Sequence, residues 1–443
     1  MIRRRLEWIR GSVGRLGPTW LAGAIAAGPA TMATLLTAGA GYGYTLLWVV
    51  VLSAVLGAMG QYLAARLGLL SGEGIVQTVE RHLGKPWAWL LVLDVVVAAG
   101  LAQLVIMRTV ADVSAAIAVN AGIATLGDPR VWGIIWAVIL ALGLAGGGYR
   151  VAEFAAKVLV SGVVIAFVVS LFVVPIDARA AVSGLTPQIP PEIGAAMVAA
   201  AILGGAVHIT LLTMQSYTMR ARGWGRGELP LVRFDITTSM LLAFGGYSLA
   251  IFLVAASVLA GVSDLSPLQA AEALGPLVGE HATWLFLIGL WGAAVTTLGG
   301  NTVVPPYLLA DKLGWETHIG DRRYRALLAG VALVSGAGAF IEGALFPLLV
   351  LVLAFGLIGT PFALVLILIL LHDPEAVSEP TTRRATAGGV VVLVVATVLA
   401  GSTVLEQVRV ADGPLSFIVI AFAVVMVVAI VILLLNVSNQ RFR

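Results

Sequence analysis

Two short stretches decide how this sequence folds: Gly28-Pro29-Ala30-Thr31 and Gly204-Gly205-Ala206-Val207-His208. Each lies within an apolar run that is long enough to cross a lipid bilayer. Gly and Pro at such positions interrupt the helix and leave backbone N–H and C=O groups unpaired, which hydrocarbon tolerates only where these groups line a cavity or meet a ligand. Two breaks in corresponding halves of a chain indicate a carrier with inverted repeats and a substrate site near the bilayer midplane.

The composition is that of an integral membrane protein. Of 443 residues, 60% are hydrophobic and 11% are charged, and the mean hydropathy is +1.03, far outside the range of soluble domains. A helical span needs about 20 apolar residues. Twelve runs meet this need: 18–40, 44–68, 87–117, 131–148, 151–175, 195–219, 234–262, 282–310, 324–341, 344–371, 387–405 and 414–436. We therefore expect one all-α transmembrane domain over residues 1–443, surrounded by the lipid bilayer.

The distribution of basic residues predicts the orientation. If the N-terminus is cytoplasmic, most of the 26 Lys and Arg residues fall in cytoplasmic loops, and only Arg130, Arg179 and Arg409 fall in outer loops. This asymmetry is the positive-inside rule, so both termini are expected in the cytoplasm of what we expect to be a bacterial cell. It accounts for the pI of 9.3 without nucleic-acid binding. The N-terminus lacks the pattern of a cleaved signal peptide, and the absence of Cys excludes disulfides and thiolate metal sites.

Several motifs recur in a known family. They are Leu16-Gly17-Pro18, Gly28-Pro29-Ala30-Thr31, Gly43-Tyr44-Thr45-Leu46-Leu47-Trp48, Gly184-Leu185-Thr186-Pro187 and Thr360-Pro361-Phe362-Ala363. In these motifs the chain resembles the NRAMP family of proton-coupled divalent-metal transporters, which has Asp-Pro-Gly-Asn at the first break. The resemblance implies a LeuT-type fold of about twelve helices. Spans 1–5 (18–175) and 6–10 (195–371) would be the inverted repeats, helices 1 and 6 would be broken, and 387–436 would hold two peripheral helices.

The sequence departs from the family at the metal site. The resemblance implies that the metal ligands would be a first-span Asp and Asn, a sixth-span Met and a tenth-span Gln. Those positions carry Gly28, Thr31, His208 and Leu353 here, and Thr210 replaces a family His. Divalent cations need carboxylate oxygens, or softer ligands with a counter-charge. Dehydrating such an ion without charge compensation is too costly, so we expect no metal site and no cofactor.

The remaining groups favour a different solute. The first N–H groups of each half-helix lack partners and carry the positive end of the helix dipole, which suits a carboxylate or another small anion. Thr31 and Thr210 offer hydroxyls, and His208 changes charge near neutral pH. The sequence therefore predicts a small anionic or zwitterionic solute, with protons as the candidate coupling ion. Three plainer interpretations stay open: His208 bonds a neighbouring helix, Thr31 and Thr210 bond back to the carbonyl four residues earlier, and Gly204-Gly205 form a close-packed helix face.

Two further polar residues lie within spans. Asp94, deep in the third span, is a second candidate for proton coupling. Asn301, in the eighth span before Pro305-Pro306, either faces the cavity or restores hydrogen bonds at a kink. No nucleophile–base pair or nucleotide loop is present, so an enzyme is not expected.

Three functions are consistent with the sequence. The first is secondary transport of a small anionic or zwitterionic solute. The second is transport of a divalent metal cation through a rebuilt site. The third is a membrane sensor or scaffold that keeps the fold without transport.

Overall fold

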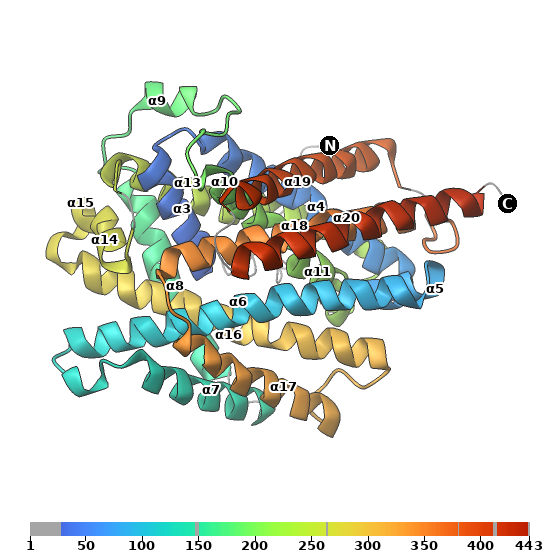
Figure 1. Cartoon of the computed structure of the whole chain (residues 1–443), viewed down its shortest axis with the longest axis horizontal. Helices are drawn as coiled ribbons and strands as arrows, with labels where there is room; N and C mark the ends of the chain where they lie inside the picture. The colour runs from blue at the N-terminus through green and yellow to red at the C-terminus, as the bar shows by residue number, and fades with distance from the viewer. Residues whose placement is uncertain (1–27, 147–149, 263–264, 380, 411–413, 442–443) are drawn as a thin grey trace, which may run out of the picture.

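The protein is a bundle of helices, most of which run along the long axis of the molecule (Figure 1). The computed structural model describes residues 28–441 except 147–149, 263–264, 380 and 411–413, and that part of the chain contains helices and no β-strand. Nine helical segments of the described chain are long and apolar enough to cross a membrane, and Phe154–Ser170 is a shorter apolar helix. The predicted all-α membrane fold is confirmed.

The helices follow the predicted spans. They are α3 (Pro29–Tyr42), α4 (Leu47–Ser71), α5 (Ile75–His82), α6 (Lys85–Asn120), α7 (Pro129–Gly146), α8 (Arg150–Ser170), α9 (Ala178–Ser183), α10 (Ala195–Val207), α11 (Ile209–Ala221), α12 (Leu229–Thr238), α13 (Gly245–Val258), α14 (Pro267–Ala271), α15 (Gly275–Val278), α16 (Ala282–Leu313), α17 (Arg322–Ser335), α18 (Leu345–Leu371), α19 (Arg383–Val410) and α20 (Pro414–Arg441). Each of the twelve predicted spans coincides with a helix, although residues 18–27 lie outside the described residues.

Three spans have unusual helices. The third span, α6, has 36 residues, which makes it about 54 Å long and longer than the roughly 30 Å hydrocarbon core. The seventh span joins α12 to α13 through a π-helical segment at Ser239–Phe244. The eighth span, α16, is one continuous helix of 32 residues despite Pro305 and Pro306.

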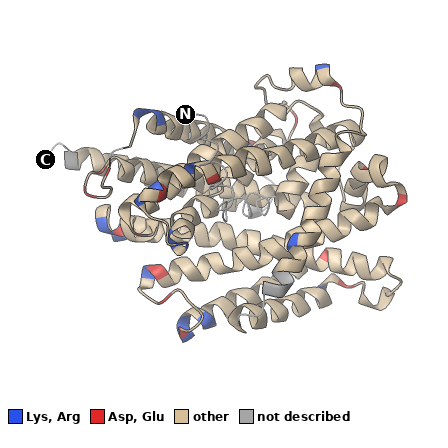
Figure 2. Ribbon diagram, turned by 180° about the vertical axis from the view of Figure 1, so that it is seen from behind, with Lys and Arg blue, Asp and Glu red and all other residues tan. Residues whose placement is uncertain are grey.

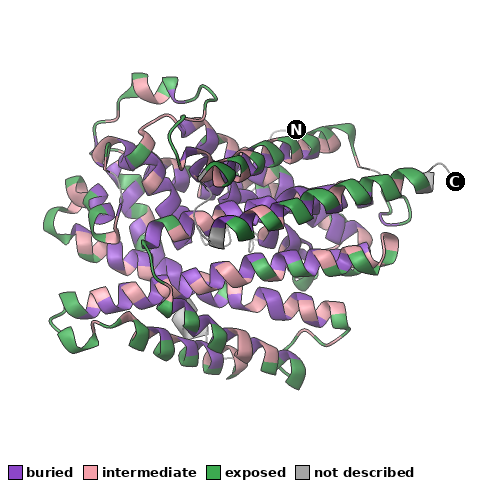
Figure 3. Cartoon of the chain, in the orientation of Figure 1, coloured by how far each residue is buried: buried purple, intermediate pink, exposed green. Residues whose placement is uncertain are grey.

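Burial separates central helices from peripheral ones (Figure 3). The most apolar windows of residues 195–221 and of α18 are both 83% buried, whereas those of α7, α19 and α20 are 22%, 33% and 28% buried. The outer helices expose apolar side chains such as Leu142 and Phe417, and such side chains suit contact with lipid tails. The broken span and α18 therefore form the centre of the bundle.

Small residues make the centre compact. Helix α10 has the sequence AAMVAAAILGGAV, rich in Ala and Gly, and eleven of its residues are buried. It packs against α18, α4, α3 and α19. Small side chains allow helix backbones to approach closely, which is how helices associate without a hydrophobic driving force in lipid. This packing places the break after Val207 between α3, α11 and α18.

Charged residues gather at the ends of the bundle. Lys and Arg concentrate at the end where α5 and the C-terminus lie (Figures 1 and 2); we call this the basic end. The opposite end holds α9, α14 and α15 (Figure 1). The predicted orientation places the basic end in the cytoplasm.

Candidate substrate-binding site

Helix α3 begins at the first break. Gly28 is its N-cap, with an extended backbone of φ −65° and ψ 172° and no capping side chain. Pro29 is the first helical residue, where its missing N–H costs no hydrogen bond. Ala30 and Thr31 already belong to the first helical turn, so the prediction that they are unwound is wrong. The first N–H groups of α3 thus lie beside the break, because a helix cannot pair them internally.

The second break is confined to one residue. Helix α10 ends at Val207 and α11 begins at Ile209, and His208 between them has φ −51° and ψ 139°. Gly204 and Gly205 lie inside α10, so the prediction of an unwound segment from Gly204 to His208 is too wide. The break itself is confirmed.

The two glycines serve close packing instead. A side chain on Gly204 would collide with the backbone carbonyl of Leu353 in α18, and a Cβ on Gly205 would lie 3.2 Å from Thr31 Oγ1. These contacts are the alternative that the sequence left open, a close-packed helix face. They bring α10, α3 and α18 together at the break, and Leu353 contributes its backbone to that contact.

His208 caps α11. Its Nδ1 accepts a hydrogen bond from the Thr210 backbone N–H (3.3 Å) and lies 2.6 Å from Thr210 Oγ1. Because Nδ1 accepts, the neutral ring carries its proton on Nε2. The ring fits against Gly356 of α18, where a side chain would collide with it, and only 5% of His208 is exposed. Protonation of Nδ1 would remove the cap, so a proton role for His208 requires the break to rearrange.

A cavity of about 410 Å³ opens at the two breaks. It is lined by Gly28, Pro29, Ala30, Thr31, Ala102, Ile106, Gly204, Gly205, His208, Thr210, Leu211, Met214, Arg222, Thr296, Thr297, Gly300, Asn301, Val304, Val352 and Leu353. Ten of the predicted site residues are therefore brought together. Ala206 and Val207 are not among the lining residues: their carbonyls accept hydrogen bonds from Gln61 and Thr360 in the packed core.

On one side of the cavity, the sequence predicted only Asn301. It lies with Thr297, Gly300 and Val304 on one face of α16, at the i, i+3, i+4 and i+7 spacing of a helix. That periodicity was visible in the sequence, but only the packing of α16 against α6 and α3 identifies the face as a cavity lining.

Within the described residues, the cavity has no acidic lining residue. Arg222 is its one charged lining residue. It lies at the far end of α11, about 20 Å from His208 along the helix axis. No group of three or more His, Asp or Glu residues that could hold a metal ion occurs in the described part of the chain. The polar groups of the lining are therefore mainly hydroxyls, an amide and a thioether, beside the helix N-termini.

Asp94 lies outside the cavity. It is 1% exposed, and neither of its carboxylate oxygens has a hydrogen-bond partner among the described residues. Its carboxylate fits against Gly359 of α18. Gly359 is three residues from Gly356, which contacts His208, and residues at this spacing are neighbours on a helix surface. The two predicted proton-coupling residues, Asp94 of α6 and His208 at the break, thus pack against glycines of α18 that are about one helical turn apart.

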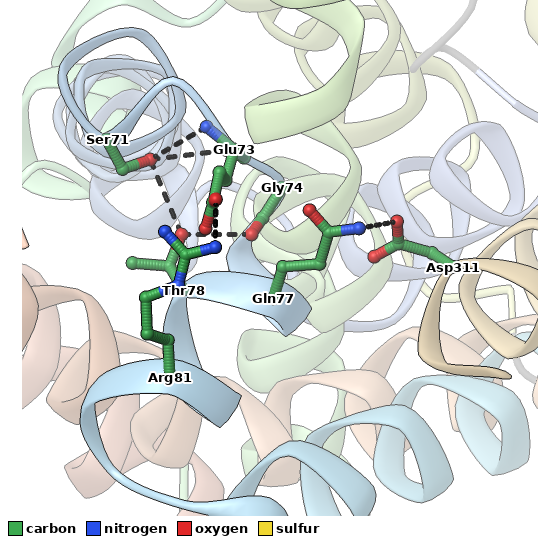
Figure 4. A network of polar contacts seen from close by, with 7 residues as sticks. All are labelled: Ser71, Glu73, Gly74, Gln77, Thr78, Arg81 and Asp311. Atoms are coloured by element: carbon green, nitrogen blue, oxygen red, sulfur yellow. Dashed lines mark hydrogen bonds and ion pairs between the residues drawn. The ribbon is translucent and has the colours of Figure 1, made fainter. Parts of the chain in front are cut away.

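A polar cluster joins helices at the basic end (Figure 4). Asp311 of α16 accepts hydrogen bonds from Gln77 of α5 (2.9 Å) and from the Tyr217 hydroxyl of α11 (2.8 Å). Next to it, Lys312 bonds Glu80 of α5 at 2.7 Å. Asp311 and Lys312 of α16 thus both bond to α5, and Asp311 also bonds to α11, the second half of the broken span.

The comparisons with known proteins agree with this architecture. A family model described as "Natural resistance-associated macrophage protein-like" matches residues 19–407. The divalent metal cation transporter MntH of Mycobacterium tuberculosis is 30% identical over 389 residues, covering 84% of this chain and 86% of that protein. MntH of Deinococcus radiodurans is 27% identical over 401 residues, covering 87% and 88%.

Solved structures show the same fold. The manganese transporter of Eremococcus coleocola matches with a TM-score of 0.73 at 18% identity, covering 98% of this chain and 96% of that one. The nucleobase-cation-symport-1 family transporter Mhp1 matches with a TM-score of 0.51 at 14% identity, covering 92% of this chain and 95% of that one. The LeuT-type fold and the break in the sixth span are confirmed, and the chain belongs to the natural resistance-associated macrophage protein (Nramp) family of multi-pass membrane transporters.

Proposed function

We propose that the chain is a secondary transporter that moves a small anionic or zwitterionic solute by alternating access through the cavity at the two breaks. The observation that carries this proposal is the chemistry of the cavity lining. The lining residues include hydroxyls and helix N-termini but, among the described residues, neither Asp nor Glu. Helix N-termini stabilise negative groups of a ligand. The proposal includes two inverted repeats, which span residues 18–175 and 195–371.

Divalent metal transport is the second candidate, and the family relationship favours it over the first. The relatives with 27–30% identity are named divalent metal cation transporters. Neutral ligands for a metal are present in the cavity, namely Met214, Asn301 and the hydroxyls of Thr31 and Thr210. The difficulty is charge: a divalent ion that loses its water shell in a buried site needs a nearby negative group.

We assign the role of proton coupling to Asp94 in preference to His208. A buried carboxylate without a hydrogen-bond partner is costly when ionised, so its proton can be taken up and released as the surroundings change. His208 is already engaged as the cap of α11. The proposed binding site of the coupling proton is therefore the Asp94 carboxyl group, which packs against Gly359.

The predicted orientation completes the proposal. Both termini lie in the cytoplasm of a bacterial cell, with the protein in the cell membrane. The support is the excess of Lys and Arg at the basic end (Figure 2). Labelling of single Cys residues introduced into the chain, which has no Cys of its own, tests this orientation.

Uptake into proteoliposomes separates the two candidate substrates. The purified protein is assayed for Mn²⁺ entry with a metal-quenched dye, and for entry of labelled alanine, propionate and bicarbonate, each with and without a pH gradient. We expect uptake of at least one of the three labelled solutes and no Mn²⁺ uptake.

A matched variant restores the family residues. Gly28→Asp with Thr31→Asn places a carboxylate and an amide at the first break, and the backbone at Gly28 accepts a side chain because its φ is −65°. We expect this variant to gain Mn²⁺ binding. Saturable Mn²⁺ uptake by the unmodified protein would overturn the first proposal in favour of the second. The absence of both metal uptake and solute uptake would favour a membrane sensor or scaffold.

A further inference from the structure

One amide in the cavity lining has a fixed orientation, that of Asn301 in α16. Its Nδ2 donates to the carbonyl oxygen of Ala99 (2.8 Å) and to Gln103 Oε1 (3.0 Å), both in α6. A backbone carbonyl only accepts hydrogen bonds. The nitrogen of Asn301, and not its oxygen, must therefore face α6.

Gln103 is fixed in the same way. Its Nε2 donates to Thr302 Oγ1 (2.6 Å) and to the carbonyl oxygen of Leu298 (3.4 Å). The Thr302 hydroxyl itself donates to Leu298 O at 2.6 Å, so Thr302 Oγ1 accepts from Gln103. Gln103 is 2% exposed and Thr302 is fully buried. Turning either amide over would set oxygen against oxygen in a dry environment, which is costly.

This arrangement determines what Asn301 offers to a solute. Asn301 is half-buried and lines the cavity. Both of its N–H groups are committed to α6. Its Oδ1 is the remaining polar atom, and no described residue donates a hydrogen bond to it. A carboxamide oxygen accepts two hydrogen bonds, so Asn301 presents an acceptor to the cavity and selects a solute that carries a donor.

We propose that Asn301 Oδ1 binds an ammonium group of the solute, and that the solute is a small zwitterion such as an α-amino acid rather than a simple anion. Gln103 is the positioning residue that holds the amide. This inference rests on the proposed transport of a small solute. The half-helix N-termini suit the carboxylate, and Asn301 suits the ammonium. A zwitterion brings no net charge to the breaks, and the one charged residue of the described lining, Arg222, lies at the far end of α11.

The test uses two solutes that differ in the ammonium group. Uptake of labelled alanine and of labelled propionate is measured in proteoliposomes containing the full chain. A hydrogen bond to a charged group corresponds to roughly 10- to 100-fold in affinity, so we expect the unmodified protein to prefer alanine by at least about tenfold in KM. Asn301→Leu should raise the KM for alanine to the level of propionate and leave propionate unchanged.

Three further variants distinguish a specific role from loss of folding. Asn301→Asp places an oxygen, instead of the donating nitrogen, opposite Ala99 O and Gln103 Oε1, so the acceptor loses its fixed orientation and the preference for alanine should fall. Gln103→Leu frees the Asn301 amide to turn, so the preference should fall by roughly 3- to 10-fold. Asn120→Leu is the control, because Asn120 lies exposed at the end of α6, where its amide bonds Ala116 O at 2.8 Å; it should behave like the unmodified protein.

The outcomes separate this inference from the proposed function. Equal uptake of alanine and propionate, or an undiminished preference in Asn301→Leu, would overturn the role of Asn301 and leave transport of a small solute standing. Uptake of neither solute above that of protein-free vesicles would overturn the zwitterion, and bicarbonate and Mn²⁺ uptake then decide whether the proposed function falls with it.

Discussion

At the basic end of the bundle, Asp311, Glu80 and Lys312 form hydrogen bonds and an ion pair across α5, α11 and α16. Helix α16 also lines the central cavity, but no Asp or Glu of the described chain is a lining residue there. The two regions differ in how charge is compensated: the Lys312 side chain is only 5% exposed but pairs with Glu80 at 2.7 Å, whereas the described cavity lining offers an ion no acidic partner.

This difference concerns how the central cavity would balance the charge of a bound solute. Helix N-termini, hydroxyls and a fixed amide are dipoles that need no counter-ion when the cavity is empty. A zwitterionic solute of the kind we propose would carry its own charge balance into this site. The basic end, in contrast, holds helices together with paired charges.

The largest expected effect comes from overpacking the centre. In Gly204→Ala the new methyl group collides with the backbone carbonyl of Leu353, which cannot turn away as a side chain would. Overpacking of this kind costs about 1–3 kcal/mol or more, and it separates α10 from α18 at the break. We expect near-complete loss of uptake and a lower melting temperature in detergent.

Gly246→Ala is the matched control for that prediction. Gly246 lies in α13 with no atom within 4 Å of the position that a Cβ would occupy, so this variant should keep full uptake. Normal uptake by Gly204→Ala would show that α10 and α18 are less closely packed in the working protein.

A smaller effect is expected from Asp94→Asn. The amide has nearly the shape of the carboxyl group but cannot exchange a proton, so uptake driven by a pH gradient should fall by about tenfold or more, within the usual contribution of proton transfer groups. Exchange of solute without a gradient should persist. Folding should also persist, because the carboxylate has no hydrogen-bond partner in the described chain to lose.

Asp112→Asn provides the control on the same helix. Asp112 pairs with Arg108 at 3.2 Å, and Arg108 also donates to the carbonyl of Gly343 at 2.6 Å, so the local structure keeps a contact. Its gradient-driven uptake should match that of the unmodified protein. An equal loss in both variants would remove the special role of Asp94.

The smallest effect is expected at the basic end. Tyr217→Phe removes the hydroxyl that donates to Asp311 (2.8 Å) and accepts from the Val76 N–H (3.3 Å). Two hydrogen bonds of about 1 kcal/mol each are lost, which corresponds to a fall in melting temperature of about 2–4 °C in a chain of this length. Uptake should change by less than about threefold.

Tyr307→Phe tests whether the ring or the hydroxyl matters. The Tyr307 ring packs edge-on against Tyr217 with centroids 5.2 Å apart, and this variant keeps that contact. It should melt like the unmodified protein. A loss of uptake in Tyr217→Phe as severe as that in Gly204→Ala would show that the basic end and the centre act as one unit.

The sequence by itself determined the membrane class, the twelve spans, the residues near both breaks and the lack of an acidic residue at Gly28. These features follow from local rules. Twenty apolar residues span a bilayer, Pro29 cannot continue a preceding helix, and a charge that is missing from the chain cannot be supplied by folding. Family membership was also readable, because motifs such as Gly43–Trp48 are contiguous.

Only the tertiary structure decided the roles of the side chains at the site. His208 is a helix cap because Gly356, almost 150 positions later in the chain, leaves room for its ring. Gly204 packs on Leu353, and Asn301 is oriented by Gln103, across similar separations. Such contacts depend on how helices from the two halves of the chain meet, and no local pattern encodes which face of α16 turns toward α6.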